Sequence, residues 1–183
     1  MALSATICKA QISIADMDRH HYQDYRLTVA RHPSENDERM MQRVLCFAMY
    51  ACEGLEFTKG LSTDDEPDLW HKDLSGDIQH WIDLGQPDEK RLRRACGRAQ
   101  RVTIHCYSGH SARIWFDKSL PRLSRFRHLS IVHIEPEQCA ELALLAARNM
   151  MLQVSIEDAQ IYVSDADHSV LVTPTTWYPA TPS

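Results

Sequence analysis

The sequence predicts an α/β fold of the α+β type, in which a mixed β-sheet is flanked by helices. Residues 6–14 alternate between apolar and polar side chains, which is typical of a half-buried strand. Residues 87–150 alternate between helical and strand patterns, which favours a locally parallel section of sheet. Residues 152–174 contain three short strand patterns separated by polar turns, so extra strands are expected near the C-terminus.

The first half of the chain begins with a predicted pair of strands and a helix. Residues 25–29 repeat the alternation of the opening strand, which favours an antiparallel pair. Ser34 followed by Asp37 resembles a capping box with aspartate in place of glutamate. We therefore expect a helix from about Glu35 to Cys52.

One acid of this helix has an unusual predicted position. Glu38 is three residues before the apolar Met41, which places it at the edge of the core-facing stripe. A buried carboxylate is costly without a partner. Glu38 therefore either serves a site, pairs with an arginine such as Arg31, or rotates out to water.

The remaining elements follow in a regular order. The sequence predicts a short strand at 54–59, a hairpin at 67–85, a helix from Pro87 to about Ala99, strands at 101–107 and 128–134 around a partly helical 111–123, and a helix at 135–150.

Length and composition suit one soluble globular domain over residues 1–183. The chain has 44% hydrophobic and 25% charged residues, and its longest apolar run is far shorter than the roughly 20 residues of a membrane span. The six cysteines are widely spread without a CxxC pair, which favours reduced thiols. With no secretory pattern at the N-terminus, we expect a cytoplasmic protein without membrane contact.

The charge is distributed unevenly along the chain. The net charge is −5, which argues against a simple nucleic-acid coat protein. Residues 86–101 hold six basic and two acidic side chains, so this segment carries four net positive charges and the remainder nine net negative ones. Any anion site is therefore expected to be local.

The hairpin PDLWHKDLSGDIQHWIDLG places two acids opposite each other. If Ser75 and Gly76 form a two-residue turn, the numbers of opposed residues sum to 151. Trp70 then meets Trp81, Lys72 meets Gln79, and Asp68 meets Asp83. Cβ atoms of opposed residues lie about 4.5–5.5 Å apart, where like charges destabilise a sheet.

Three arrangements would relieve this repulsion. A divalent cation could bind both carboxylates, one acid could be protonated, or the strand ends could splay into solvent. A one-residue bulge would undo the register altogether.

The helix after the hairpin carries a basic stripe. Lys90, Arg94, Arg98 and Arg101 recur at helical spacing. A basic helix beside two acids is consistent with a phosphodiester site, with metal on the acids and phosphates along the arginines. The alternative is an ordinary solvated helix face.

Three segments carry a family resemblance. ARHPSENDERMM, FTKGLSTDDEPDLW and WIDLGQPDEKRLRRACGRA resemble the YaeQ family of small bacterial proteins over nearly the whole chain. The resemblance implies a fold related to the PD-(D/E)xK restriction-endonuclease-like core, spanning roughly residues 34–134.

The resemblance also implies roles for individual residues. Asp68 corresponds to the PD acid, Asp83 to the acid of the (D/E)xK element, and Glu38 to the glutamate of the first core helix. The chain departs from the pattern at Gly85, where the nuclease lysine would stand.

Other side chains could replace that lysine. Gln86 could hold a water molecule, Lys90 could reach back from the helix, and Lys72 lies on the Asp68 face of the hairpin.

Two functions are compatible with these residues. The first is a metal-dependent nuclease with Mg²⁺ or Mn²⁺ on Asp68, Asp83 and Glu38, and with Gln86 or Lys90 positioning the nucleophile. In it, Arg94 and Arg98 hold the phosphates of DNA or RNA. The second is a non-catalytic module on the same scaffold that binds nucleic acid or a protein partner.

Overall fold

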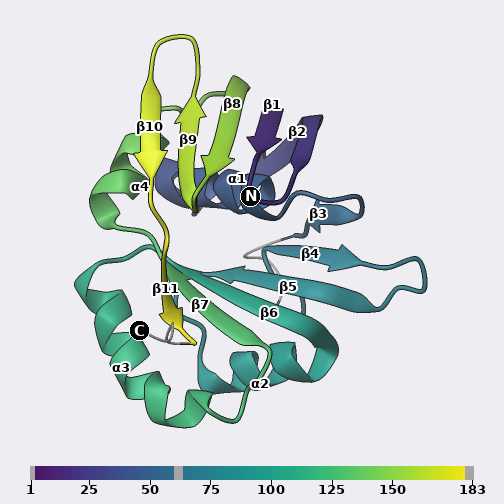
Figure 1. Cartoon of the computed structure of the whole chain (residues 1–183), viewed down its shortest axis with the longest axis vertical. Coiled ribbons are helices and arrows are strands. Elements are labelled where there is room, and N and C mark those ends of the chain that lie inside the picture. Colours follow the sequence, from purple (N-terminus) through teal and green to yellow (C-terminus); the bar gives the residue numbers. More distant parts are fainter. Residues whose placement is uncertain (1–2, 60–63, 180–183) are drawn as a thin grey trace. The chain divides into compact units, whose positions relative to one another are not determined.

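The structure, a computed structural model, describes residues 3–59 and 64–179. Its contacts divide the chain into two compact units (Figure 1). The first unit comprises Met1–Met49 and Glu137–Pro174, and the second comprises Tyr50–Pro136 and Thr175–Ser183. The prediction of one domain over the whole chain stays a prediction.

The first unit contains a mixed sheet in the order β10-β9-β8-β1-β2. Strand β1 pairs antiparallel with β2 and parallel with β8. Buried and exposed residues alternate along β1 and β8, as the period of two predicts for a sheet with one covered face. The elements are β1 (Thr6–Asp16), β2 (His21–Arg31), α1 (Asp37–Tyr50), α4 (Pro136–Ala143), β8 (Asn149–Glu157), β9 (Gln160–Ser164) and β10 (Ser169–Val172).

The second unit contains a mixed sheet in the order β11-β7-β6-β5-β4-β3. Strands β5, β6 and β7 are parallel, which confirms the predicted parallel section. The other neighbouring strands pair antiparallel. The elements are β3 (Leu55–Phe57), β4 (Leu69–Lys72), β5 (Ile78–Leu84), α2 (Glu89–Arg98), β6 (Ala99–Cys106), α3 (His110–Leu123), β7 (Leu129–His133) and β11 (Thr175–Tyr178).

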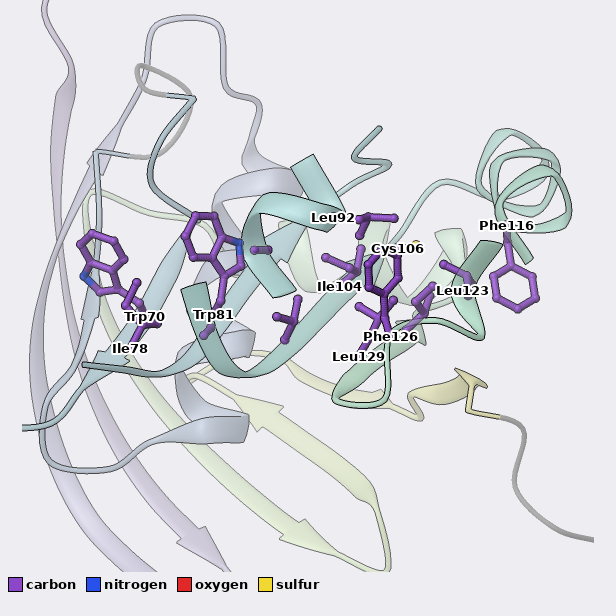
Figure 2. Packing of buried hydrophobic residues seen from close by; sticks show 14 of the residues in the cluster. Trp70, Ile78, Trp81, Leu92, Ile104, Cys106, Phe116, Leu123, Phe126 and Leu129 are labelled. Atoms are coloured by element: carbon purple, nitrogen blue, oxygen red, sulfur yellow. The ribbon is translucent and has the colours of Figure 1, made fainter. Parts of the chain in front are cut away.

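The core of the second unit lies between one face of its sheet and helices α2 and α3. Figure 2 shows the buried side chains that these elements contribute. Leu92 of α2 and Leu123 of α3 are almost completely buried, and the rings of Trp70 and Trp81 meet edge to face at 6.4 Å. Because Trp81 and Asp83 lie two residues apart on β5, they point to the same face of the sheet. This packing therefore directs Asp83 towards the face that α2 covers.

The mixed α+β fold is confirmed, with differences in two predicted helices. The helix expected at 135–150 ends at Ala143, and Asn149 begins β8 instead. Residues 149–156 pair with β1, and this pairing outweighs the helix propensity of Asn149 and Met150. In α1, the amide of Arg39 donates to the side chain of Asn36, so Asn36 rather than Ser34 caps the helix. Within the described ranges, no helix is both long and apolar enough to cross a membrane.

Candidate functional site

The β4–β5 hairpin has the predicted register over most of its length. Leu69 pairs with Ile82, Trp70 with Trp81 and His71 with His80, and each pair of numbers sums to 151.

The turn of this hairpin differs from the prediction. The amide of Asp73 donates to the carbonyl oxygen of Asp77 at 3.0 Å, which leaves three residues rather than Ser75 and Gly76 alone in the loop. Gly76 has φ +90°, a conformation that favours glycine. Hydrogen bonds from the backbone amide of Asp77, then from Ser75 and the side chain of Gln79, hold the pKa of Asp73 below its ordinary value.

A bulge then restores the register. Lys72 pairs with Ile78 and not with Gln79, so the predicted Lys72–Gln79 pair is wrong. The extra residue in the turn and the extra residue in the strand offset each other. Lys72 lies with its ammonium group 3.6 Å from the centre of the Trp70 ring.

Asp68 is buried and completes the hairpin ladder. Its amide donates to the carbonyl oxygen of Ile82 at 3.0 Å, and its Oδ2 accepts the amide of Leu84 at 2.9 Å. Its relative exposure is 4%. The carboxylate of Asp68, directly before the first residue of β4, therefore takes the place of a backbone carbonyl as the acceptor for the amide of Leu84.

Asp83 is buried at 2% exposure and forms an ion pair with Arg91. The guanidinium donates from Nε to Oδ2 at 2.8 Å and from Nη2 to Oδ1 at 2.9 Å. The indole of Trp81 donates to Oδ2 at 3.0 Å. Hydrogen bonding to Asp83 raises the pKa of Arg91 above its ordinary value against the effect of burial, and the charges of Asp83 and Asp68 add to the rise.

This arrangement does not fit a bound metal ion. Both oxygens of Asp83 already accept hydrogen bonds, and a divalent cation would be repelled by the guanidinium of Arg91. In the part of the chain that the structure describes, no three His, Cys, Asp or Glu side chains form a group able to hold an ion.

Glu38 belongs to a different unit from the two aspartates. It is half-buried on α1 in the first unit, whereas Asp68 and Asp83 lie in the second. The metal site expected on Glu38, Asp68 and Asp83 together therefore stays a prediction.

The buried acid next to α1 is Glu35, which sequence reasoning missed. Its exposure is 4%, and Arg43 donates to both of its oxygens at 2.8 and 2.6 Å, while Arg39 donates at 3.1 Å. Arg31 pairs with Asp37 at 2.6 Å. The signal that could have found this network is the spacing of Glu35, Arg39 and Arg43 at four-residue steps.

Gly85, where the resemblance leads us to expect a lysine, has φ +99°. An added Cβ would meet no atom within 4 Å, so the constraint is the backbone conformation and not a lack of space. A lysine at this position would have to adopt a left-handed conformation that costs about 1–2 kcal/mol. Gln86 donates to the hydroxyl of Ser111 at 3.0 Å.

The basic residues of α2 contact a neighbouring acidic segment. Arg94 donates to the carbonyl oxygen of Asp64 at 2.8 Å and to the carboxylate of Asp65 at 2.9 Å. Arg98 donates to the carbonyl oxygen of Asp65 at 2.6 Å. The phosphate-binding role of these two arginines stays a prediction.

Two further basic residues of the predicted stripe differ in position. Lys90 is exposed and, with Arg91, Arg94 and two acids, lines a cavity of about 220 Å³. Arg101 lies on β6 beyond the end of α2, so its predicted place in the helical stripe is wrong.

A second cationic group joins the start of α2 to the end of α3, and we call it the Glu89 arginine cluster. Glu89 contacts Arg93 at 2.9 Å, Arg122 at 2.6 Å and Arg125 at 3.6 Å. The three arginine side chains are 64%, 62% and 54% exposed. Burial alone would raise the pKa of Glu89, but the hydrogen bonds and charges of these arginines hold it below its ordinary value.

Sequence reasoning missed the Glu89 arginine cluster. The patterns of the two helices do not show which of their ends meet. A surplus of arginines near 122–127 was the available signal.

Two buried histidines lie on the same sheet. His80 hydrogen-bonds Thr103 Oγ1 through Nε2, and His105 hydrogen-bonds the hydroxyl of Tyr50, both at 2.8 Å. Burial lowers the pKa of each to about 3, and for His80 the charge of Arg101 contributes as well. Both rings are therefore neutral near pH 7.

Comparison with known proteins gives matches over nearly the full chain. The family model described as "YaeQ protein" matches residues 1–174. The chain is 43% identical over 177 residues to proteins named "Uncharacterized protein YaeQ" from Salmonella typhi and Escherichia coli K12, covering 97% of this chain and 98% of each relative.

Two crystal structures are similar to this fold. The YaeQ protein from Xanthomonas axonopodis pv. citri gives a TM-score of 0.92 at 42% identity, covering 95% of this chain and 98% of that one. The YaeQ protein from Pseudomonas syringae gives 0.91 at 32% identity, covering 96% and 97%.

Proposed function

We propose that this chain, which belongs to the YaeQ family, is a non-catalytic module that binds the phosphodiester backbone of nucleic acid. The proposed contact surface is the Glu89 arginine cluster together with the exposed Lys90. One observation carries the proposal: three exposed arginines contact a single glutamate, so these four side chains hold two net positive charges.

Phosphate is the ligand that suits this cluster best. Guanidinium groups bind phosphate oxygens with paired hydrogen bonds, and exposed ion pairs with Glu89 are weak enough to exchange partners. The chain as a whole is acidic, so binding is confined to this surface and depends on local rather than net charge.

The pairing of Asp83 with Arg91 favours a non-catalytic role. The buried acid that a metal would need is held by a cation from the protein itself.

The test is the salt dependence of binding to a labelled oligonucleotide, measured by fluorescence anisotropy. Log Kd should rise linearly with log salt concentration. The double variant Arg122→Gln/Arg125→Gln should weaken binding and reduce the slope by about 1–2.

A matched control removes the same charge elsewhere. Arg26 and Arg148 are exposed and lie outside the proposed surface, so Arg26→Gln/Arg148→Gln should leave the slope nearly unchanged. An interaction that does not respond to salt would overturn the proposal and favour a protein partner.

A metal-dependent nuclease with a PD-(D/E)xK-like core is the second candidate. One observation favours it: Asp68 and Asp83 are both buried at the same end of the β4–β5 pair. It requires Arg91 to leave Asp83 when Mg²⁺ or Mn²⁺ binds.

Calorimetry with Mn²⁺ and cleavage assays on single- and double-stranded DNA and RNA separate the candidates. Cleavage that depends on Mn²⁺ and is lost in Asp68→Ala would establish the nuclease and refute the non-catalytic role.

A further inference from the structure

A half-open cavity of about 170 Å³ lies between helices α2 and α3 beside the Glu89 arginine cluster. One part of its wall is apolar and comes from Leu92, Leu123, Phe126 and the ring of Trp115. The polar part consists of Asp88, Glu89, Lys118, Ser119 and Arg122. The cavity therefore has an apolar wall and a charged rim.

The aromatic wall is held in place. The indole of Trp115 donates from Nε1 to the carbonyl oxygen of Pro87 at 2.8 Å, which fixes the ring at the start of α2. Phe126 is buried at 7% exposure, and its amide donates to the carbonyl oxygen of Leu123 at 2.9 Å. A ligand would meet surfaces that are already ordered, so its binding costs little rearrangement.

Arg122 connects the cavity with the cationic surface. It lines the cavity and is also the nearest of the three arginines to Glu89. Lys118 adds a second cation at the rim, one turn before Arg122 on α3. An apolar recess and a positively charged surface thus meet at one side chain.

Size and charge together select a class of ligand. A recess of about 170 Å³ is smaller than the roughly 300–1,000 Å³ of a pocket that holds a whole drug-sized molecule. It suits one flat ring system with the remainder of the ligand outside. The carboxylates of Asp88 and Glu89 repel an anion inside the recess but can accept hydrogen bonds from ring amino groups.

We infer that the cavity takes the base of an unpaired nucleotide whose phosphate lies on the Glu89 arginine cluster. This inference rests on the proposed function and specifies its substrate as single-stranded nucleic acid. Bases within a duplex are stacked and paired, so they enter a recess of this kind only at the cost of roughly a few kcal/mol of unstacking and unpairing, which favours a single strand. Single-strand binding proteins use the same combination of aromatic surfaces and cations.

The first experiment compares three labelled DNA ligands with the wild-type protein at one salt concentration. These are a single strand, the same strand with abasic sites, and its duplex. Stacking of a base on an aromatic side chain contributes enough for at least about a fivefold preference for the intact single strand. Equal affinity for intact and abasic strands would overturn the inference, even if salt-dependent binding persists.

The second experiment fills the cavity. Ser119 lines it, so Ser119→Leu should weaken binding of the intact strand by about fivefold and leave binding of the abasic strand unchanged. The control Ser124→Leu adds the same side chain at an exposed position that does not line the cavity, and it should have no effect. If Ser119→Leu does not fold, the wild-type comparison decides.

Two other outcomes are informative. Absence of binding to every oligonucleotide would refute the proposed function itself and, with it, the inference. Competition by a phosphotyrosine peptide but not by a nucleoside monophosphate would assign the recess to a protein ligand and overturn the inference alone.

Discussion

The ion pair between Asp83 and Arg91 should contribute strongly to stability. We consider Arg91→Met, which keeps most of the apolar stem but removes the guanidinium. The substitution deletes two charge-assisted hydrogen bonds to Asp83 and two further bonds to the carbonyl oxygens of Asp64 and Glu66. The buried carboxylate of Asp83 then keeps the hydrogen bond from the indole of Trp81 but loses both bonds from the guanidinium.

The magnitude follows from the burial of the two partners. Removing one partner of a buried ion pair costs about 3–5 kcal/mol. Asp83 is 2% exposed but the side chain of Arg91 is 25% exposed, so water already screens part of the interaction. We therefore expect Arg91→Met to lower the free energy of unfolding by about 2–4 kcal/mol.

Urea denaturation at pH 7 measures this loss. The double variant Asp83→Asn/Arg91→Met should recover part of it, because no uncompensated charge then remains in the core. The control Arg93→Met removes a 64% exposed guanidinium from the same helix and should cost less than about 0.5 kcal/mol. An Arg91→Met protein as stable as Arg93→Met would refute this reasoning.

Three further predictions concern stability. His80 and His105 have folded pKa values of about 3 against 6.5, so the unfolded chain binds more protons below pH 6.5. The contribution of these neutral histidines to the free energy of unfolding is therefore fully present above pH 6.5 and falls as the pH drops towards 3. Between pH 7 and 5 we expect a loss of about 2 kcal/mol per histidine, measured by urea titrations at each pH. Gly85→Ala should destabilise by about 1–2 kcal/mol because of its φ of +99°, whereas Gly97→Ala within α2 should stabilise by up to about 1 kcal/mol, as thermal melts would show. Glu35→Gln should cost about 2–4 kcal/mol by chemical denaturation, since it leaves buried guanidinium charge without its carboxylate.

Local patterns predicted the strands well because burial repeats every two residues along a strand. The alternation of residues 6–14 gave the correct buried face of β1, and the hairpin sum gave the correct partner for Trp70. The hairpin prediction succeeded through two offsetting errors, in the turn and at Gln79. Register beyond a turn is set by the packed face of the strands, so a slip near the loop is corrected within a few residues.

Tertiary pairing was beyond such patterns. The sequence places Arg91 within a basic segment, but only the packing of α2 on β5 shows that it reaches Asp83. Similarly, Arg122 meets Glu89 across 33 residues of sequence. A charged residue's partner is chosen by the fold, whereas its position on a helix face follows from spacing alone. Sequence analysis therefore located the basic segment and missed which of its cations remain exposed.

The contacts around Asp83 give a physical reason for a glycine rather than a lysine at position 85. A lysine two residues after Asp83 would place a cation beside a buried acid, and Arg91 already supplies that cation from α2. The left-handed backbone of Gly85 in turn disfavours any side chain there. Because the amide of Gly85 donates to the carbonyl oxygen of His105 at 2.8 Å, this turn is fixed to the neighbouring strand and cannot relax freely for a larger residue. The charge of Asp83 is thus balanced by Arg91 from α2, and Gly85 serves the backbone turn rather than supplying a cation.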